Sequence, residues 1–249
     1  MTIPKKIHYC WLSGEPIPKD IQKCMQTWRD KMPDYELILW DKNKFDINSV
    51  DFVREACEAK KWASASDYIR AYALYTDGGI YLDTDVIVRK SFDEFLKYDF
   101  FTAIERALSN EKKTHKLDIR GIAIQAAILG GIKGHPYLRD VLSWYETHHF
   151  INSEYNIKHI APNIYASVAL KYGFKCKNQY QRLKKDNMLV LPAPLFAENL
   201  STATQESYAV HCCKASWVHK DFLYFCRRNN LLRKIFKKRQ FQRLDDVII

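Results

Sequence analysis

The amino-acid sequence predicts an α/β fold, a mostly parallel sheet flanked by helices, from two observations. In the first third of the chain, short apolar runs alternate with longer segments whose apolar residues recur at helical spacing. Strands that alternate with helices in this way pair in parallel, because each helix carries the chain back across the sheet. The composition, 47% hydrophobic and 27% charged over 249 residues, is typical of a globular chain with one sizeable core.

The elements of the first half of the chain follow from this spacing. We expect strands at residues 5–12, 35–40 and 80–86, and helices at residues 18–31, 51–60 and 66–75. For the third helix, Ser64 or Ser66 is available as the N-cap. Gly78 and Gly79 are expected to end it, because glycine takes the left-handed conformation that closes a last helical turn.

The second half of the chain gives shorter elements. We expect strands at residues 100–105, 123–130, 188–192 and 208–213, and helices at residues 136–147 and 164–172. Residues 106–118 have the composition of an exposed loop. No internal repeat, low-complexity linker or convincing domain boundary interrupts the pattern.

Four charged side chains give the strongest chemical signal. Asp67 and Arg70 stand three residues apart, so they share one helix face. Asp83 and Asp85 stand two apart on a predicted strand, so with Tyr81 they share one strand face. Two neighbouring carboxylates resist burial, and a divalent cation such as Mg²⁺ or Mn²⁺ removes that cost and suits oxygen ligands.

Position in the predicted sheet favours the same site. Ligands of parallel α/β sheets bind beyond the carboxyl ends of the strands, where Trp11, Asp41 and the two aspartates fall. A simpler interpretation stays open for each feature alone. An Asp-x-Asp triplet is more often a solvated loop, and an exposed Asp–Arg pair is worth only about 0.3–0.5 kcal/mol.

The combination resembles a known family. SDYIRAYALYTDGGIYLDTDV, which starts at Ser66, resembles the signature of glycosyltransferase family 32, the sugar-transferase proteins with an Asp-x-Asp motif. These are similar in turn to the catalytic domains of the large clostridial glucosylating toxins. IPKKIHYCWLSGEPIPKDI resembles the family's first strand and loop, PDYELILWD its second strand, and HCCKASWVHK its closing segment. Between residues 97 and 200 the resemblance is loose, through GIAIQAAILGGIKGHPYL and IAPNIYASVAL.

The resemblance implies a GT-A-like catalytic domain over residues 1–220 and a nucleotide-sugar donor, most simply a UDP-sugar, with Mn²⁺ or Mg²⁺. It assigns the cation to Asp83, Asp85 and His211. It assigns hydroxyls of the donor sugar to Asp67 and Arg70, with Asp83 also near the ribose. The remaining implied contacts to the nucleotide are Trp11 on the base, Ser66, Tyr81, and a closing loop with Ser216 and Trp217.

The family is retaining, and no nucleophile stands at a defensible position, so front-face displacement is expected rather than a covalent intermediate. Gln125 is a further candidate for contact with the sugar. Taken alone, His211 is more often structural and Trp217 more often a core aromatic. The resemblance gives no acceptor, and residues 106–165 are expected to line its site.

The C-terminal segment carries most of the charge. Residues 227–243 hold eight Lys and Arg and no acid, which is +8 of the formal +10. Apolar residues recur every three or four positions over residues 222–243, which predicts a basic amphipathic helix within an extension at 221–249. Such a helix docks on an anionic membrane surface. The alternatives are a helix packed on the domain and, least favoured, a nucleic-acid-binding tail, so no nucleic acid is expected.

Localisation is expected to be cytoplasmic, peripheral on the inner face of the plasma membrane. No apolar run reaches the roughly 18 residues of a membrane span, and no signal peptide is evident. The seven cysteines are odd in number and form no C-x-x-C pair, which fits a reducing compartment.

The expected function is the transfer of a sugar to a saccharide acceptor, possibly undecaprenyl-linked, in the synthesis of a bacterial capsule or surface polysaccharide. The alternatives are a toxin-like effector that glycosylates host proteins and a basic binding protein without enzymatic activity. A metal-dependent phosphatase or nuclease would leave Trp11 and the Asp67–Arg70 pair without a role.

Overall fold

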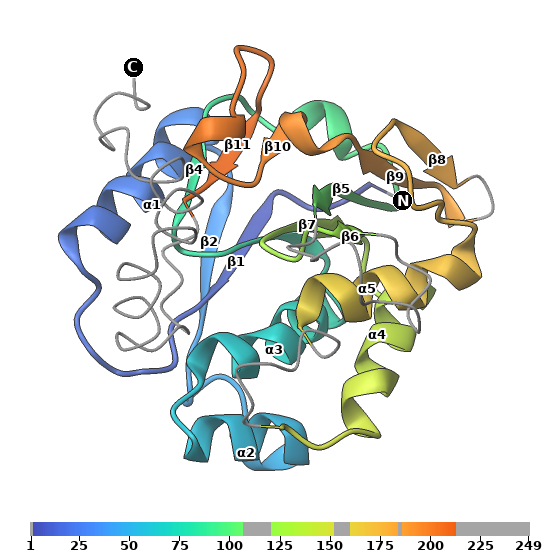
Figure 1. The fold of residues 1–249 in the computed structure, drawn as a ribbon. Coiled ribbons are helices and arrows are strands. Elements are labelled where there is room, and N and C mark those ends of the chain that lie inside the picture. The colour runs from blue at the N-terminus through green and yellow to red at the C-terminus, as the bar shows by residue number, and fades with distance from the viewer. Residues whose placement is uncertain (1, 107–120, 152–159, 184–185, 213–249) are drawn as a thin grey trace, which may run out of the picture.

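A computed structural model describes residues 2–106, 121–151, 160–183 and 186–212 of the protein. Within these ranges the chain forms a mixed eight-stranded sheet with helices on both faces and a second, three-stranded sheet (Figure 1). The order of the main sheet is β2 (Glu36–Trp40), β1 (Lys6–Cys10), β3 (Gly79–Leu82), β7 (Ile128–Gly131), β5 (Phe100–Arg106), β9 (Met188–Leu191) and β8 (Gln181–Leu183), with β6 (Ile122–Ile124) paired to β5.

The main sheet is mixed, with β2, β1, β3, β5 and β9 running in one direction and β7, β6 and β8 in the other. β1 pairs in parallel with both β2 and β3, and β5 pairs in parallel with β9. β7 lies antiparallel between β3 and β5, so these two strands run in the same direction. The predicted class, an α/β fold with a sheet flanked by helices, is confirmed.

One face of the main sheet is covered by four helices. These are α2 (Asp51–Glu58), α3 (Trp62–Asp77), α4 (Pro136–Glu146) and α5 (Ala161–Ala169), seen below the sheet in Figure 1. Their apolar sides form one continuous core with the residues of the sheet that face them. The helix α3 lies centrally in this layer, and its residues Ile69, Ala73 and Leu74 are fully buried.

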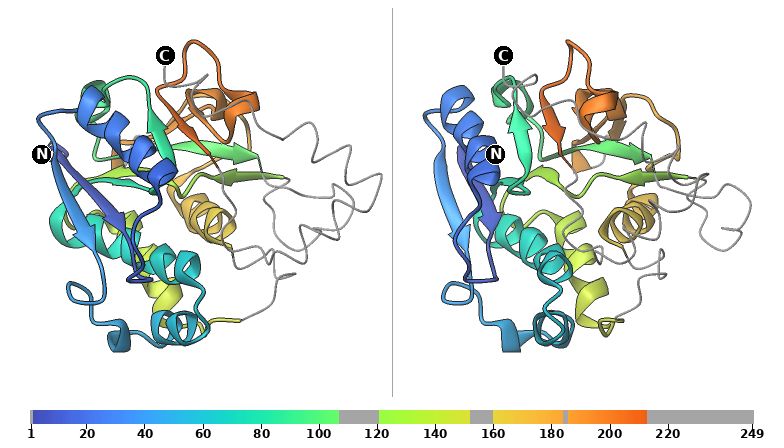
Figure 2. Two further views of the ribbon diagram at one scale, coloured as in Figure 1. Left: turned by 90° about the vertical axis from the view of Figure 1, so that its left-hand side faces the viewer. Right: turned by 60° about the vertical axis from the view of Figure 1, so that its left-hand side comes forward.

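The other face carries α1 (Lys19–Lys31) and the second sheet, whose order is β10 (Phe196–Ala197), β11 (Ala209–His211) and β4 (Val86–Val88). Figure 2 shows α1 and these strands side by side in both views. Two side chains of α1 fix β4: Trp28 Nε1 donates to the Val86 carbonyl at 2.7 Å, and Thr27 Oγ1 accepts from the Val88 amide at 2.9 Å. Short 3₁₀ helices occupy Ile47–Ser49, Asp93–Phe95, Leu170–Tyr172, Ala193–Leu195 and Leu200–Thr202.

Two predicted strands are wrong in the same way, because each splits at a turn. The strand expected at 80–86 ends at Leu82, and the chain re-enters the second sheet at Val86 after a turn closed by the Val86 amide on the Asp83 carbonyl at 3.0 Å. The strand expected at 123–130 divides into β6 and β7. The carbonyls of the linker between them accept from other elements instead of continuing a ladder; the Ala127 carbonyl, for example, accepts from the Asp83 amide at 2.9 Å.

The third helix is longer than predicted. It begins at Trp62, its N-cap position Lys61 makes no side-chain cap hydrogen bond, and so neither Ser64 nor Ser66 is the cap. The helix ends at Asp77, where Gly78 has φ 66° and ψ 166°: a positive φ, as expected, but not the left-handed helical conformation. Gly79 is required by close packing, because a Cβ there would meet the Lys6 carbonyl oxygen at 2.8 Å.

A buried histidine joins the first strands to this helix end. His8 is fully buried on β1; Trp40 Nε1 donates to its Nδ1 at 3.0 Å, and its Nε2 lies 2.8 Å from the Gly78 carbonyl. Since Nδ1 must accept, Nε2 carries the proton and the ring is neutral. Burial lowers the pKa of His8 accordingly.

Within the described ranges, no helix combines the length and the apolar character needed to cross a membrane.

Replacing His8 with Leu should lower the free energy of unfolding by roughly 2–6 kcal/mol, since two buried groups lose partners at about 1–3 kcal/mol each. Because the folded state disfavours the protonated ring, the stability that His8 contributes is complete above its unfolded pKa of about 6.5 and is lost as pH falls below it. Urea unfolding at pH 7.5 and 5.5 tests both parts. The difference between wild type and variant should shrink at the lower pH; a variant as stable as wild type at pH 7.5 would contradict the account.

Candidate functional site

The site begins with a carboxylate and a guanidinium on α3. Arg70 Nη2 lies 2.9 Å from Asp67 Oδ1, as the spacing of three residues predicts. Arg70 is only 4% exposed, and 17% of the Asp67 side chain is exposed. The pair is therefore buried beneath the edge of the sheet, which excludes the interpretation as a solvated surface ion pair.

The guanidinium of Arg70 also contacts groups outside its own helix. Nη1 donates to the Ala126 carbonyl at 2.7 Å, and Nη2 lies 3.2 Å from Asp83 Oδ1. Nε and Nη2 donate to the backbone carbonyl and the hydroxyl of Ser66 at 3.3 and 3.2 Å. Arg70 therefore bridges α3, the turn after β3 and the linker between β6 and β7.

Tyr81 adds a second contact to Asp83. Its hydroxyl donates to Asp83 Oδ1 at 2.9 Å, and its ring lies under the guanidinium of Arg70, 4.9 Å from Cζ to the ring centroid. Both interactions that hold Asp83 therefore use Oδ1. The second oxygen, Oδ2, faces the opposite direction, toward His211.

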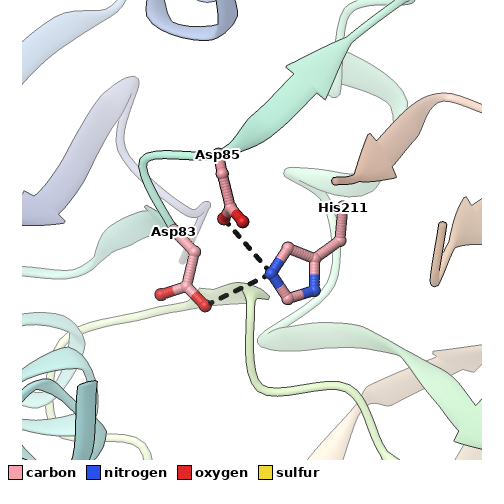
Figure 3. A group of neighbouring side chains, drawn as sticks. All are labelled: Asp83, Asp85 and His211. Atoms are coloured by element: carbon pink, nitrogen blue, oxygen red, sulfur yellow. Dashed lines mark ion pairs between the residues drawn. The ribbon is translucent and has the colours of Figure 1, made fainter. Parts of the chain in front are cut away.

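Asp83, Asp85 and His211 converge at the seam between the two sheets. His211 Nε2 lies 3.2 Å from Asp85 Oδ1 and 3.8 Å from Asp83 Oδ2, and Figure 3 shows the three side chains pointing toward one another. One ligand atom from each lies within 4.8 Å of the others. All three are partly buried, with side chains 15–23% exposed.

Backbone pairing explains why His211 reaches this place. β11 runs antiparallel to β4 with His211 opposite Val86, and the Cys212 amide donates to the Asp85 carbonyl at 3.0 Å. The turn at Asp83–Asp85 is thus followed directly by β4, the strand that pairs with β11 at His211. The prediction that the two aspartates share one strand face is therefore wrong, because both lie in this turn.

The charges of this region call for a cation. Asp67, Asp83 and Asp85 supply three carboxylates against the single guanidinium of Arg70, a formal charge of −2. A neutral imidazole directs a lone pair or one N–H at two carboxylates, whereas a divalent ion satisfies all three ligands together. Carboxylate oxygen and imidazole nitrogen are suitable donors for ions of the Mn²⁺ type. The donor set therefore fits the expected metal.

Burial also changes the acidity of neighbouring carboxyls. Burial raises the pKa of Asp67 to about 7, even though the adjacent Arg70 acts in the opposite direction. Burial likewise raises the pKa of Glu105, at the end of β5, to about 7, with Glu198 and Asp83 adding to the rise and His211 opposing it. Two carboxyls with perturbed acidity therefore lie at this edge of the sheet, a feature typical of functional sites.

Trp11 lies at the same edge of the sheet. In the β1–β3 register His8 is opposite Tyr81, so Trp11, just past the end of β1, is level with the turn after β3. Its amide donates to the Trp40 carbonyl at 3.0 Å, and Nε1 donates to the Glu15 carbonyl at 2.6 Å. The half-buried indole is thus held in the loop after β1, and its contact with the nucleotide stays a prediction.

Not every predicted residue lies at the site. Asp41 closes a local turn by accepting from the amides of Asn43 and Lys44, both at 3.0 Å, so its carboxylate is in use there. Ser216, Trp217 and the extension at 221–249 lie outside the described residues.

Several contributors were not found from the sequence. The Ala126 carbonyl and Tyr165, whose hydroxyl donates to the Asp67 carbonyl at 3.2 Å, lie far from the motif along the chain. For Glu105, one feature of the sequence could have indicated the site, namely a carboxylate at the carboxyl end of a buried strand. Gln125, named earlier as a candidate for contact with the sugar, is fully buried and donates to the Phe196 carbonyl at 3.3 Å.

Residues 18–102 match a family model described as a glycosyltransferase sugar-binding region containing a DXD motif. This range includes Asp67, Arg70 and the Asp83-Thr84-Asp85 triplet. Over this range, the resemblance to the sugar-transferase family with an Asp-x-Asp motif is confirmed.

Curated relatives match part of the chain. Inositol phosphoceramide mannosyltransferase 3 of Schizosaccharomyces pombe is 29% identical over 145 residues, which cover 57% of this chain and 36% of that protein. Uncharacterized glycosyltransferase L373 of Acanthamoeba polyphaga mimivirus is 31% identical over 108 residues, 40% of this chain and 42% of that protein. Subversion of eukaryotic traffic protein A of Legionella pneumophila is 28% identical over 119 residues, 37% of this chain and 18% of that protein. The matched part is thus less than half the length of each relative.

Solved structures similar to this one also carry glycosyltransferase names. PaToxG glycosyltransferase has a TM-score of 0.49 at 19% identity, over 68% of this chain and 69% of that one. The galactosyltransferase LgtC has a TM-score of 0.43 at 11% identity, over 96% of this chain and 98% of that one.

Replacing Arg70 with Met should destabilise the protein by about 3–5 kcal/mol, because the carboxylates of Asp67 and Asp83 lose the charge between them. Arg54→Met is the matched control: Arg54 is half-buried and pairs with the exposed Asp51, so that change should cost less than about 1 kcal/mol. Urea unfolding in the presence of a chelator measures both. Equal effects of the two substitutions would refute the bridging role of Arg70.

Proposed function

On the premise that residues 18–102 match the glycosyltransferase sugar-binding region, we propose that this protein is a metal-dependent, retaining glycosyltransferase. It moves a sugar from a nucleotide-sugar to a hydroxyl of a saccharide acceptor. The observation that carries the proposal is the convergence of Asp83, Asp85 and His211 beside the buried Asp67–Arg70 pair. A phosphatase or nuclease site would have no use for that pair or for Trp11.

Asp83, Asp85 and His211 would hold a Mn²⁺ or Mg²⁺ ion. When bound, the ion supplies positive charge to the diphosphate of the donor and so stabilises the leaving nucleoside diphosphate. Tyr81 and Arg70 both donate to Asp83 Oδ1, which leaves Oδ2 directed toward the ligand position shared with His211. Their contribution is to fix the orientation of the ligand before the donor binds.

Asp67 is the better candidate of the α3 pair for direct contact with the donor sugar. Its side chain keeps some exposure, and one oxygen accepts from Arg70 while the other is available to a hydroxyl. Arg70 already donates to two backbone carbonyls, one hydroxyl and two carboxylates. We therefore assign to Arg70 the positioning of Asp67 and Asp83.

The proposed reaction is a front-face displacement. The bond between the anomeric carbon and the β-phosphate oxygen breaks, the acceptor oxygen bonds to the same face of that carbon, and the acceptor's proton passes to the departing phosphate. The products are the glycosylated acceptor and the nucleoside diphosphate, with the anomeric configuration retained. Ser66 and Trp11 would contact the nucleotide, and Ser216 and Trp217 would close over the diphosphate and exclude water.

The donor and acceptor follow from chemistry and from the relatives' names. A UDP-sugar is the expected donor because of the stacking role given to Trp11, and GDP-mannose is the second choice because several relatives are named mannosyltransferases. Two relatives are named for inositol phosphoceramide, which supports a lipid-linked acceptor. We place the activity in capsule or surface polysaccharide synthesis in a bacterial cytoplasm, with an undecaprenyl-linked acceptor and residues 222–243 on the membrane surface.

A second candidate function is the glycosylation of host proteins by an effector. The similarity to the Legionella protein named for subversion of eukaryotic traffic favours it. The two candidates share the donor site and the domain at 1–220, and they differ in whether the acceptor is a saccharide or a protein side chain.

Purified protein with Mn²⁺ should slowly release one nucleoside diphosphate from a panel of UDP-glucose, UDP-galactose, UDP-N-acetylglucosamine and GDP-mannose. Asp85→Asn and His211→Gln should each lower that rate by about 100-fold or more, because charge stabilisation of several kcal/mol is lost. Asp30→Asn, a change at an exposed residue of α1, is the matched control and should leave the rate unchanged. A metal-independent rate, or no binding of any donor, would refute the proposal.

A further inference from the structure

Glu105 lies on the same side of the main sheet as His211. It is the penultimate residue of β5, and side chains alternate along a strand. Phe101 and Ala103 pack into the core on the side of α1 and the second sheet, so Glu105 points to that side too. Only partly exposed, it ends the buried run of the strand.

The second sheet brings His211 and Glu105 together. β10 pairs in parallel with β11, with Ala197 opposite Val210, so the next residue, Glu198, is level with His211. The side chain of Glu198 in turn accepts a hydrogen bond from the backbone amide of Arg106. Glu105, the neighbour of Arg106, therefore lies across this seam from His211, which opposes the rise in the pKa of Glu105.

Within the described residues, no hydrogen-bond donor reaches the carboxylate of Glu105. No ion pair among these residues reaches it either, although burial costs the charged form its hydration. In its ionised form the carboxylate can only accept hydrogen bonds, so this position suits a ligand that supplies hydroxyl groups.

A second hydrogen-bond acceptor lies along the same seam. Gln125 is fully buried and donates through Nε2 to the carbonyl of Phe196 on β10. Its Oε1 has no hydrogen-bond partner among the described residues. Its backbone amide donates to the Ala103 carbonyl at 2.9 Å, which sets it beside the strand that carries Glu105. Two side chains whose oxygens have no hydrogen-bond donor among the described residues thus face the same side of the sheet, where β5 and β6 meet β10.

We propose that Glu105 binds the saccharide acceptor of the transfer reaction. Its carboxylate accepts a hydrogen bond from the hydroxyl that attacks the donor sugar. The assignment rests on the proposed function. It places the donor sugar beside Asp67 on the α3 side of Asp83, and the attacking hydroxyl on the β5–β10 side, next to His211.

Glu105 orients this hydroxyl and does not keep its proton. As the bond from the anomeric carbon to the phosphate oxygen breaks, the new bond to the acceptor oxygen forms and the proton passes to the departing phosphate. In the absence of an acceptor, a water molecule takes the same place, and the products are free sugar and nucleoside diphosphate. Slow hydrolysis of the donor therefore depends on Glu105 as well.

The test compares wild type, Glu105→Gln and the control Glu36→Gln, an exposed carboxylate on the edge strand β2. Binding of Mn²⁺ with UDP or GDP is measured by calorimetry, and release of the nucleoside diphosphate from the accepted nucleotide-sugar gives kcat and KM. Glu105→Gln should lower kcat by about 10- to 100-fold, the range expected when one hydrogen bond to a charged group is lost. Its nucleotide affinity and its KM for the donor should stay within about twofold of wild type. Retained nucleotide binding also shows that the variant is folded.

Two results would overturn the assignment. An unchanged kcat means that Glu105 does not contact the attacking hydroxyl, and a raised KM or weakened nucleotide binding places it on the donor side instead. Failure of the proposed function is distinguishable, because wild type would then neither bind nucleotide with Mn²⁺ nor release it from any donor, and the assignment of Glu105 would fall with it.

Discussion

The buried guanidinium of Arg70 is the interaction on which the site depends. A planar group with five N–H donors joins a helix, a strand end and a linker that lie far apart in the sequence. Without it, Asp67 and Asp83 would be two carboxylates desolvated side by side. With it, one oxygen of Asp83 is held, and the other is directed toward Asp85 and His211. The buried Arg70 thus fixes the orientation of Asp83 within the group of metal ligands.

The cluster also requires two sheets. Asp83 follows a strand of the main sheet, whereas Asp85 precedes β4 and His211 ends β11, both in the second sheet. The helix α1 fixes β4 through Trp28 and Thr27, so the packing of α1 against the second sheet determines where Asp85 lies. Charged groups are accommodated between the two sheets because the strands of both sheets end there. Glu105 and the buried amide of Gln125 line the same seam.

Local patterns predicted the elements and the α3 pair, because helix spacing alone brings Asp67 and Arg70 together. They did not predict the turn at Asp83–Asp85, since an apolar run interrupted by two aspartates looks like one strand until backbone hydrogen bonds decide otherwise. The family resemblance brought His211 to the same site, and the structure explains its place by the register of β11 against β4. Glu105 depends on pairing between β5, β10 and β11, three strands distant in sequence, and no local pattern contains that information. Ser216 and Trp217 stay predictions.

The central claim is that Asp83, Asp85 and His211 hold a divalent cation together with a nucleoside diphosphate. Pulsed electron paramagnetic resonance of Mn²⁺ bound with UDP or GDP tests it most directly, because the spectrum reports each nucleus coupled to the ion. The account predicts coupling to one imidazole nitrogen, lost in His211→Gln, and to the phosphorus of the diphosphate. A spectrum without imidazole nitrogen, or one that the substitution leaves unchanged, would contradict the account.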